Sequence, residues 1–183
     1  MEKALKALLL QSLSVLLLCA LADFGSGSVL EGMKERFRAL PGLLTVVPPL
    51  VDLRGNIGCA LGSRLGTALH LGTLKPRFSR SWELVGNALA SLFLSVVGSV
   101  TVVLVSLLIR GSLGLSFHLL SLLWIAAVSG MLAGVLITFL TILVAFQAFR
   151  RGWDPDTVTG PVMTTAGDII TILCIYLAVL WWG

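Results

Sequence analysis

The chain has 183 residues, of which 57% are hydrophobic and 12% are charged, and its formal net charge is +4. A composition this apolar excludes an ordinary soluble domain and indicates an all-α, polytopic integral membrane protein. The positive charge does not predict a nucleic-acid partner, because the basic residues lie mostly at segment ends, where they anchor and orient helices. Three scattered cysteines without a CxxC pair argue against a disulfide framework or a thiolate metal site.

The apolar residues fall into five segments, each long enough for a membrane-spanning helix of about 20 residues. They predict one membrane domain over residues 1–183, with no room for a soluble catalytic or regulatory module. The predicted spans cover residues 5–30, 41–72, 83–109, 116–149 and 160–182.

The first segment begins like a secretory signal peptide, with two lysines, an apolar run and a small-residue site at residues 20–22. Apolar residues resume after Asp23 and continue to Leu30, which favours a retained first span. Asp23 is an acid that can face inward. The charged connector over residues 31–38 is expected to form a short amphipathic turn on the membrane.

The second segment places adjacent prolines, Pro48 and Pro49, among charged residues in an apolar setting. Proline removes a backbone donor, and the segment is longer than one crossing needs, so this helix is expected to be broken or steeply tilted. At 100° per residue, one polar stripe lies within about 60° of Asp52. Its other members are Asn56, Cys59, Ser63, Thr67 and His70.

A glycine ridge at i, i+4 spacing runs beside this stripe, as is typical of closely packed helices. It consists of Gly58, Gly62 and Gly66. Arg54 points away from the stripe, and an acid on another helix or the lipid headgroups is its expected partner. An alternative interpretation of Asp52 is a structural ion pair with Arg54 or Arg64.

The third and fourth segments carry weaker signals. Glu83, Asn87 and Thr101 share one face of the third segment and form a weaker polar stripe. The fourth segment is apolar apart from hydroxyl groups, and Gly130 and Gly134 form a GxxxG pair. Helix packing is therefore its expected role.

Asp168 is the one charged residue in the fifth segment, and no basic residue lies near it in sequence. A charge at the bilayer centre costs at least ~2.5 kcal/mol, so such a residue is a functional-site hypothesis. Its helix face also carries Pro161, Thr164, Thr165 and Thr171. The preceding acids, Asp154 and Asp156, are expected to form a solvated turn that caps the helix.

Carboxylates and amides at membrane depth suit a divalent cation. Mg²⁺ keeps several waters and uses one or two carboxylates, and a twofold dimer would bring two copies of Asp168 together if the fifth span lies at the axis. An unfilled pair would share a proton instead. The motifs of metalloproteases, serine hydrolases and P-loop enzymes are missing, which argues against an enzyme.

Residues 49–56 read PLVDLRGN, and residues 60–67 read ALGSRLGT. This pair resembles the signature of the MgtE-type magnesium transporters, and most of all their solute-carrier relatives in animals, where the segments read PALLGLKGN and LASRLST. A second stretch is similar to the last span of the same family, in which a DP, a GP pair, a TT pair and an aspartate recur in order. Here these are Asp154-Pro155, Gly160-Pro161, Thr164-Thr165 and Asp168.

The resemblance covers essentially the whole chain and implies a cation-transport domain with its pore on a dimer axis. Asp168 falls on the pore aspartate of the family, and Gly55 and Asn56 fall on its GN pair. Asp52 replaces a residue that is usually uncharged in the family. The chain holds one five-helix unit without the N and CBS sensor domains of bacterial members, and the animal relatives carry two units, so a homodimer is expected.

The sequence therefore predicts a divalent-cation transporter or channel, with Mg²⁺ as the expected transported ion. The expected metal ligands are Asp168, Asn56, Asp52, Thr164 and Thr165. The expected pore-lining residues are Gly55, Ser63, Thr67, Asn87 and Pro161. The alternatives are a non-transporting scaffold subunit that binds another membrane protein through its glycine ridges, and a cation exchanger coupled to Na⁺ or H⁺.

The distribution of basic residues predicts a multi-pass protein of the cell membrane, surrounded by lipid, with a cytoplasmic N-terminus. In that orientation seven basic residues lie inside and four outside, as the positive-inside rule requires. The inner set is Lys3, Lys6, Lys75, Arg77, Arg80, Arg150 and Arg151, and the outer set is Lys34, Arg36, Arg38 and Arg110.

Overall fold

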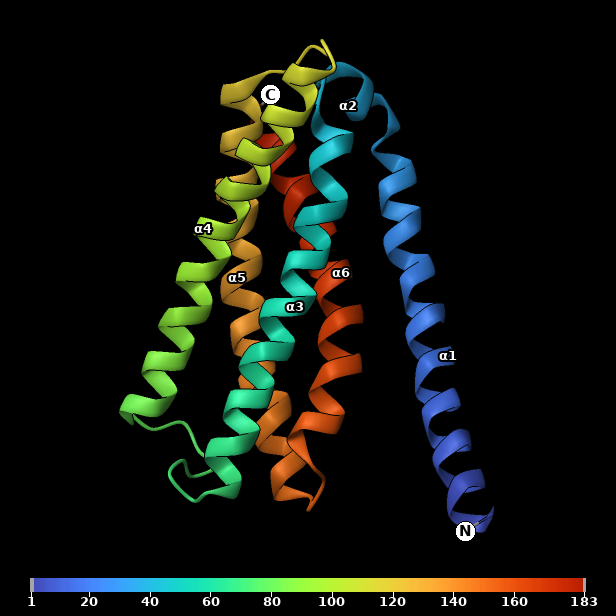
Figure 1. Ribbon diagram of the computed structural model, residues 1–183, viewed down its shortest axis with the longest axis vertical. Helices are drawn as coiled ribbons and strands as arrows, with labels where there is room; N and C mark the ends of the chain where they lie inside the picture. Colours follow the sequence, from blue (N-terminus) through green and yellow to red (C-terminus); the bar gives the residue numbers. More distant parts are fainter. Residues whose placement is uncertain (1, 183) are drawn as a thin grey trace.

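The computed structural model describes residues 2–182, and the side chains of residues 13, 17 and 19–182. Five long helices run side by side and a short helix, α2, lies at one end (Figure 1). The helices are α1 (Glu2–Gly32), α2 (Lys34–Ala39), α3 (Leu43–His70), α4 (Trp82–Ser112), α5 (Leu119–Arg150) and α6 (Pro155–Trp182). The all-helical fold expected from the sequence is confirmed in the described chain.

The second span was expected to be broken or steeply tilted, and the break is wrong, because α3 is one continuous helix. Its tilt relative to the membrane stays a prediction. Pro48 and Pro49 lie in its second turn, five and six residues after Leu43. Their missing N–H groups remove hydrogen bonds to carbonyls of the first turn only, so the rest of the helix keeps its backbone hydrogen bonds. The left-handed Gly42, with a φ of 98°, redirects the chain from α2 into α3.

The last helix begins at Pro155, five residues before the predicted start of the fifth span at residue 160. Asp154 caps it: its Oδ1 accepts from the backbone N of Asp156 at 3.2 Å, and its Oδ2 accepts from Thr157 Oγ1 at 3.0 Å. Proline suits the first helical position because no partner is needed for its missing N–H. The expected capping turn is confirmed, and Pro161 continues the helix.

The connector after α1 contains α2, where a short amphipathic turn was expected. Two exposed ion pairs stabilise its ends, Lys34 with Glu31 at 2.5 Å and Arg38 with Glu35 at 3.2 Å. Exposed pairs of this kind contribute roughly 0–1 kcal/mol each. The connector is therefore helical, and contact with a membrane surface stays a prediction.

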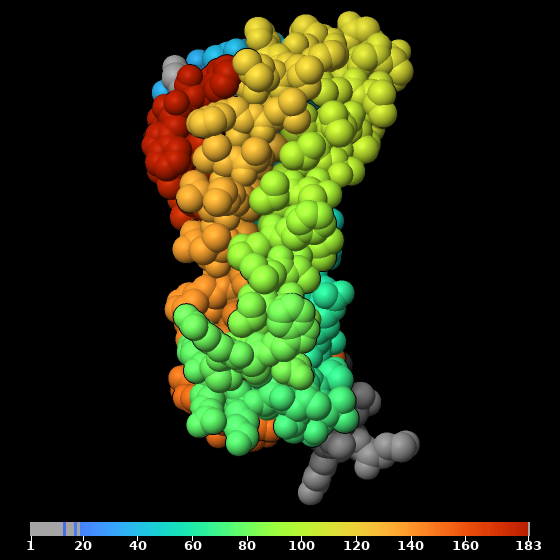
Figure 2. Space-filling view, turned by 90° about the vertical axis from the view of Figure 1, so that its left-hand side faces the viewer, coloured from blue at the N-terminus to red at the C-terminus, as the bar shows by residue number. Residues whose placement is uncertain are grey.

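In the bundle, α6 packs against α3, α5 and α1, while α5 also packs against α3 and α4. Figure 2 shows α4 on the outside, with α5 on one side and α3 on the other. Two apolar clusters fill the ends of the interior. One includes Leu43, Leu50, Leu122 and Val179, and the other includes Leu65, Leu69, Leu84 and Phe146.

Three of the described helices, α4, α5 and α6, are long and apolar enough to cross a membrane. The interface between α4 and α5 is made of small residues. A Cβ at Gly134 would lie 2.7 Å from Ser95 Cβ, and Ser91 Oγ lies 2.9 Å from Thr138 Oγ1. The packing role predicted for the GxxxG pair is confirmed, because Gly130 also faces Ser99 of α4.

Candidate ion pathway

The close contact between α3 and α6 fixes the position of Asp168. A Cβ built on Gly167 would lie 3.3 Å from the backbone N of Gly55, and a Cβ built on Gly55 would lie 3.4 Å from Thr164 Cα. Glycine on both sides permits this approach of two backbones. Asp168 is thereby held beside the middle of α3, and Gly55 is buried in the contact.

The glycine ridge continues this contact along α3. Gly58 faces Met163, Gly62 faces Thr159 and Gly66 faces Pro155. The close helix packing predicted from the i, i+4 spacing is confirmed, and α6 is the partner.

Asp168 is half-buried, and its surroundings in the described chain are acidic. Asp23 of α1 and Asp52 of α3 lie close enough for their charges to act on it. The two ion pairs of the described residues lie at α2, so none of these three carboxylates is paired with a base among the described side chains. Three helices therefore each contribute an acid to this part of the bundle.

Asp23 is the residue of this group that the predicted ligand set did not include. Its Oδ1 is buried and has no hydrogen-bond partner among the described residues. The sequence showed that Asp23 is an acid within an apolar segment. It did not show that the face of α1 that carries Asp23 lies against α6, because that depends on how the helices pack.

Asp52 and Asn56 form a pair on the exposed face of α3. Asn56 Nδ2 donates to Asp52 Oδ2 at 3.0 Å, as their i, i+4 spacing allows. Ser63 and Thr67 continue this face, and Thr67 Oγ1 donates to the Ser63 carbonyl at 3.1 Å. The predicted polar stripe is thus one continuous face, exposed at Asp52, Asn56 and Thr67.

The turn of α6 at Gly160 and Pro161 joins α1 and α3. Cys19 Sγ donates to the Pro161 carbonyl at 3.7 Å, and Cys59 Sγ donates to the Gly160 carbonyl at 3.5 Å. Thr164 Oγ1 donates to both carbonyls, at 2.9 Å to Pro161 and 3.3 Å to Gly160. Thr164 is exposed, and Thr165 beside it is half-buried.

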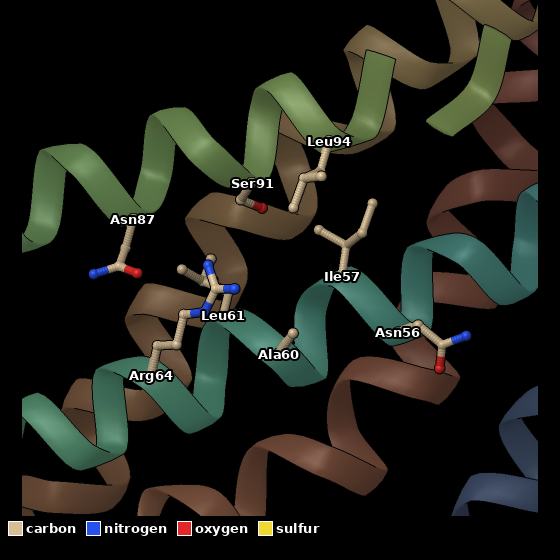
Figure 3. Close-up of a pocket in the computed structure, with 8 residues that line it drawn as sticks. All are labelled: Asn56, Ile57, Ala60, Leu61, Arg64, Asn87, Ser91 and Leu94. Carbon is tan, nitrogen blue, oxygen red and sulfur yellow. The ribbon is translucent and has the colours of Figure 1, made fainter. Parts of the chain in front are cut away.

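Asn87 lies on α4, away from the α1–α6 contact. Its Nδ2 donates to the Glu83 carbonyl at 2.7 Å, and it lines a hollow between α3 and α4 together with Asn56 (Figure 3). Asn56 therefore lies between two groups of predicted residues: it contacts Asp52, which lies near Asp168, and it shares the hollow between α3 and α4 with Asn87.

Among the described residues, Arg54 contacts neither an acid on another helix, one of its two expected partners, nor Asp52, and its burial keeps it from the lipid headgroups, the other expected partner. Its side chain is 1% exposed and points into the interface with α4. Nη1 donates to the Ser95 carbonyl at 3.0 Å, Nη2 donates to Ser99 Oγ, and Nε has no partner among the described residues. The ion pair proposed for Asp52 is also missing at Arg64 in the described chain.

The described residues contain no group of three His, Cys, Asp or Glu side chains arranged to hold a metal ion. The acids of the described part of one chain thus do not form a closed metal site by themselves.

Residues 47–178 match the family model of MgtE, described as a divalent cation transporter. The chain belongs to this family. The MgtE match begins in the first turns of α3 and ends within α6, so it includes the glycine contact, Asp52 and Asp168. Members of the MgtE family are transporters, so the predictions of a transporter family and of a non-enzyme are confirmed.

Animal relatives agree with the MgtE match. Solute carrier family 41 member 3 of Rattus norvegicus is 30% identical over 164 residues, which are 86% of this chain and 35% of that protein. Solute carrier family 41 member 2 of Homo sapiens is 29% identical over 172 residues, which are 89% of this chain and 30% of that protein. The chain spans about a third of the length of the curated relatives it matches.

Proposed function

We propose that two copies of this chain form a pathway for divalent cations, with Mg²⁺ as the transported ion, where Asp23, Asp52 and Asp168 converge. The observation that carries the proposal is the convergence of three carboxylates from α1, α3 and α6 with no basic partner in the described chain. Unneutralised acids at membrane depth are costly unless a cation, a proton or water compensates them. Membership of the MgtE family supports a divalent cation.

The proposed arrangement has five membrane-crossing helices, α1, α3, α4, α5 and α6, in one cation-transport domain. The shortest of them has 28 residues and spans about 42 Å at 1.5 Å per residue, against a hydrocarbon core of about 30 Å. An odd number of crossings puts the chain ends on opposite sides, and Figure 1 draws them at opposite ends of the bundle. The proposed location is the cell membrane, with the N-terminus cytoplasmic.

A second copy accounts for the exposed polar face of α3. Asp52, Asn56 and Thr67 are exposed in the single chain and would otherwise face lipid. A twofold axis along this face would double the carboxylates and leave room for the waters that Mg²⁺ retains.

In this proposal Asp168 holds the hydrated ion, Asp52 and Asn56 line its approach, and Thr164 and Thr165 shape the site. The remaining residues proposed to contribute to the pathway are Gly55, Ser63, Thr67, Asn87 and Pro161.

Mg²⁺ flux into proteoliposomes tests the role of Asp168. Asp168→Asn keeps the shape of the side chain and removes its charge, so uptake is expected to fall at least about 100-fold, given that an ion–carboxylate interaction at 4 Å contributes about 4 kcal/mol near a protein surface. Asp154→Asn removes the same charge from an exposed turn outside the pathway and is expected to transport normally.

Two results would contradict the proposal. Normal flux through Asp168→Asn removes this carboxylate from the mechanism. No flux through the wild-type chain at any pH or Na⁺ gradient favours a scaffold subunit, whereas flux that requires such a gradient identifies an exchanger.

A further inference from the structure

A hollow of about 170 Å³ lies between α3 and α4. Its lining combines apolar side chains of both helices with one cation, Arg64, and with three uncharged polar residues, Asn56, Asn87 and Ser91 (Figure 3). Asp168 does not line the hollow, although Asn56 and Asn87, which are also assigned to the proposed ion pathway, do. Its one charged residue, Arg64, and its large apolar residues Ile57 and Leu94 lie at different depths.

The polar end lies nearer the loop that joins the two helices. Arg64 is six residues before the end of α3 at His70, and Asn87 is five residues after the start of α4 at Trp82. At 1.5 Å per residue these positions are about 8–9 Å from the helix ends.

The apolar end lies deeper in the bundle. Ile57 is 13 residues before His70, and Leu94 is 12 residues after Trp82. These positions are about 18–20 Å from the same helix ends, which is near the middle of a bilayer. Apart from Asn56, the hollow therefore has its charged group toward the headgroup region and its large apolar side chains deeper, in the same order as the headgroup and acyl chain of a phospholipid.

Arg64 is exposed and forms no ion pair with any described residue. In Figure 3 its guanidinium group extends from α3 into the gap, and the Asn87 amide extends from α4 toward it. An arginine on a membrane helix extends toward the interface, and its planar group binds phosphate there through two parallel hydrogen bonds. Lys75, Arg77 and Arg80 of the adjoining loop add positive charge at the same end.

We propose that this hollow binds one anionic phospholipid. Arg64 donates hydrogen bonds to the phosphate, Asn87 contacts the headgroup, and one acyl chain lies between Ile57 and Leu94. The occupant is a lipid and not a free phosphate, because most of the lining is apolar. The proposal concerns a ligand site beside the ion pathway and does not depend on ion transport.

Native mass spectrometry of the purified full chain in detergent, titrated with dioleoyl phosphatidylglycerol or dioleoyl phosphatidylcholine, measures this binding. Wild type is expected to retain one phosphatidylglycerol per chain in preference to phosphatidylcholine. Arg64→Gln is expected to weaken that binding about tenfold or more, since hydrogen bonds to a charged group contribute about 1.5–3 kcal/mol. Arg36→Gln, which removes the same charge at the α2 end, is the matched control and is expected to bind like wild type.

Two further arms test the acyl-chain part. Ala60→Phe fills the hollow without changing charge and is expected to lose the lipid although Arg64 remains. This variant tests the lipid site even if Arg64→Gln does not fold. Short-chain dihexanoyl phosphatidylglycerol is expected to displace the bound lipid, and glycerol phosphate at the same concentration is not.

Wild-type affinity in both Arg64→Gln and Ala60→Phe overturns the proposal, as does equal displacement by glycerol phosphate. Loss of the dimer in Arg64→Gln at unchanged lipid binding overturns it as well, because Arg64 would then pair with an acid of the second copy.

Discussion

Arg54 and Asp168 lie almost side by side along the bundle, because the backbone of Arg54 touches Gly167, but their environments are opposite. The carbonyl carbon of Arg54 would lie 3.6 Å from a Cβ on Gly167, whereas its side chain turns away toward α4. There the guanidinium group meets hydroxyl and carbonyl oxygens and no carboxylate. The acidic side of the α3–α6 contact and its basic side are thus separated by the helix α3 itself.

Substitution of Arg54 separates the effect of its charge from that of its volume. Arg54→Met keeps most of the volume, removes a buried charge that has no carboxylate partner, and is expected to change the free energy of unfolding by less than about 1 kcal/mol or to raise it. Arg54→Ala leaves a cavity and is expected to lower the free energy of unfolding by about 2–4 kcal/mol. Thermal unfolding in detergent compares the two, with Ser99→Ala as the control for the hydroxyl contact. Equal destabilisation by Met and Ala would instead assign the stability to the two hydrogen bonds.

The helical spacing predicted which way Arg54 points but not what it meets. A stripe calculation needs only the sequence of α3, so it correctly put Arg54 on the face opposite Asp52. The partners come from α4, whose register against α3 depends on packing across several helices, and an acid was expected where serines lie. Asp23 was left out of the ligand set for the same reason.

At the scale of helices, the contact between α3 and α6 is what sets the depth of Asp168. Gly62 is its tightest point, since a Cβ there would lie 2.7 Å from Thr159 Cβ. Thr159 is 1% exposed, and its Oγ1 has no partner among the described residues. Neither side of this contact has space to spare.

Gly62→Ala is therefore expected to destabilise the bundle by about 1–3 kcal/mol through overpacking. Gly86→Ala, in the interior of α4 with open space around its Cβ position, is expected to be neutral or slightly stabilising, because alanine favours a helix by about 0.5–1 kcal/mol. Denaturant titration followed by circular dichroism measures both.

Thr159→Gly removes the atoms that the new methyl group meets. In a double-mutant cycle it is expected to recover part of the loss caused by Gly62→Ala, with a favourable coupling energy of about 0.5–3 kcal/mol. Strict additivity of the two substitutions would show that α3 and α6 are not held together at this point.

The same pair of helices shows where sequence patterns succeed and where they fail. The i, i+4 glycine ridge correctly predicted a packing face, because small residues at this spacing let two helix backbones approach closely. The adjacent prolines suggested a break, but only their position within α3 decides whether backbone bonds are lost in the middle of the helix. They lie in the second turn, so the hydrogen bonds that they remove belong to the first turn, and the helix continues past them.

At the scale of the whole molecule, α1 stands at the edge of the bundle and packs against α6 and α2. The polar face of α3 is left exposed, with carboxylate and amide groups that cost about 2.5–3.5 kcal/mol per charge when they face the centre of a bilayer. In the proposed dimer, a second copy would cover this face with its own, remove that cost and bring the acidic groups of both copies around one axis.

Cysteine cross-linking in membranes tests this arrangement. In a chain whose Cys19, Cys59 and Cys174 are replaced by alanine, Thr67→Cys is expected to form a disulfide-linked dimer under mild oxidation, because residues beside a twofold axis meet their own copies. Leu108→Cys, on the apolar face of α4 and 75% exposed, is the control and is expected to stay monomeric at the same dilution in lipid. Equal cross-linking at both positions would indicate random collision, and cross-linking at Leu108 alone would move the interface to α4 and leave the acids of α3 facing lipid.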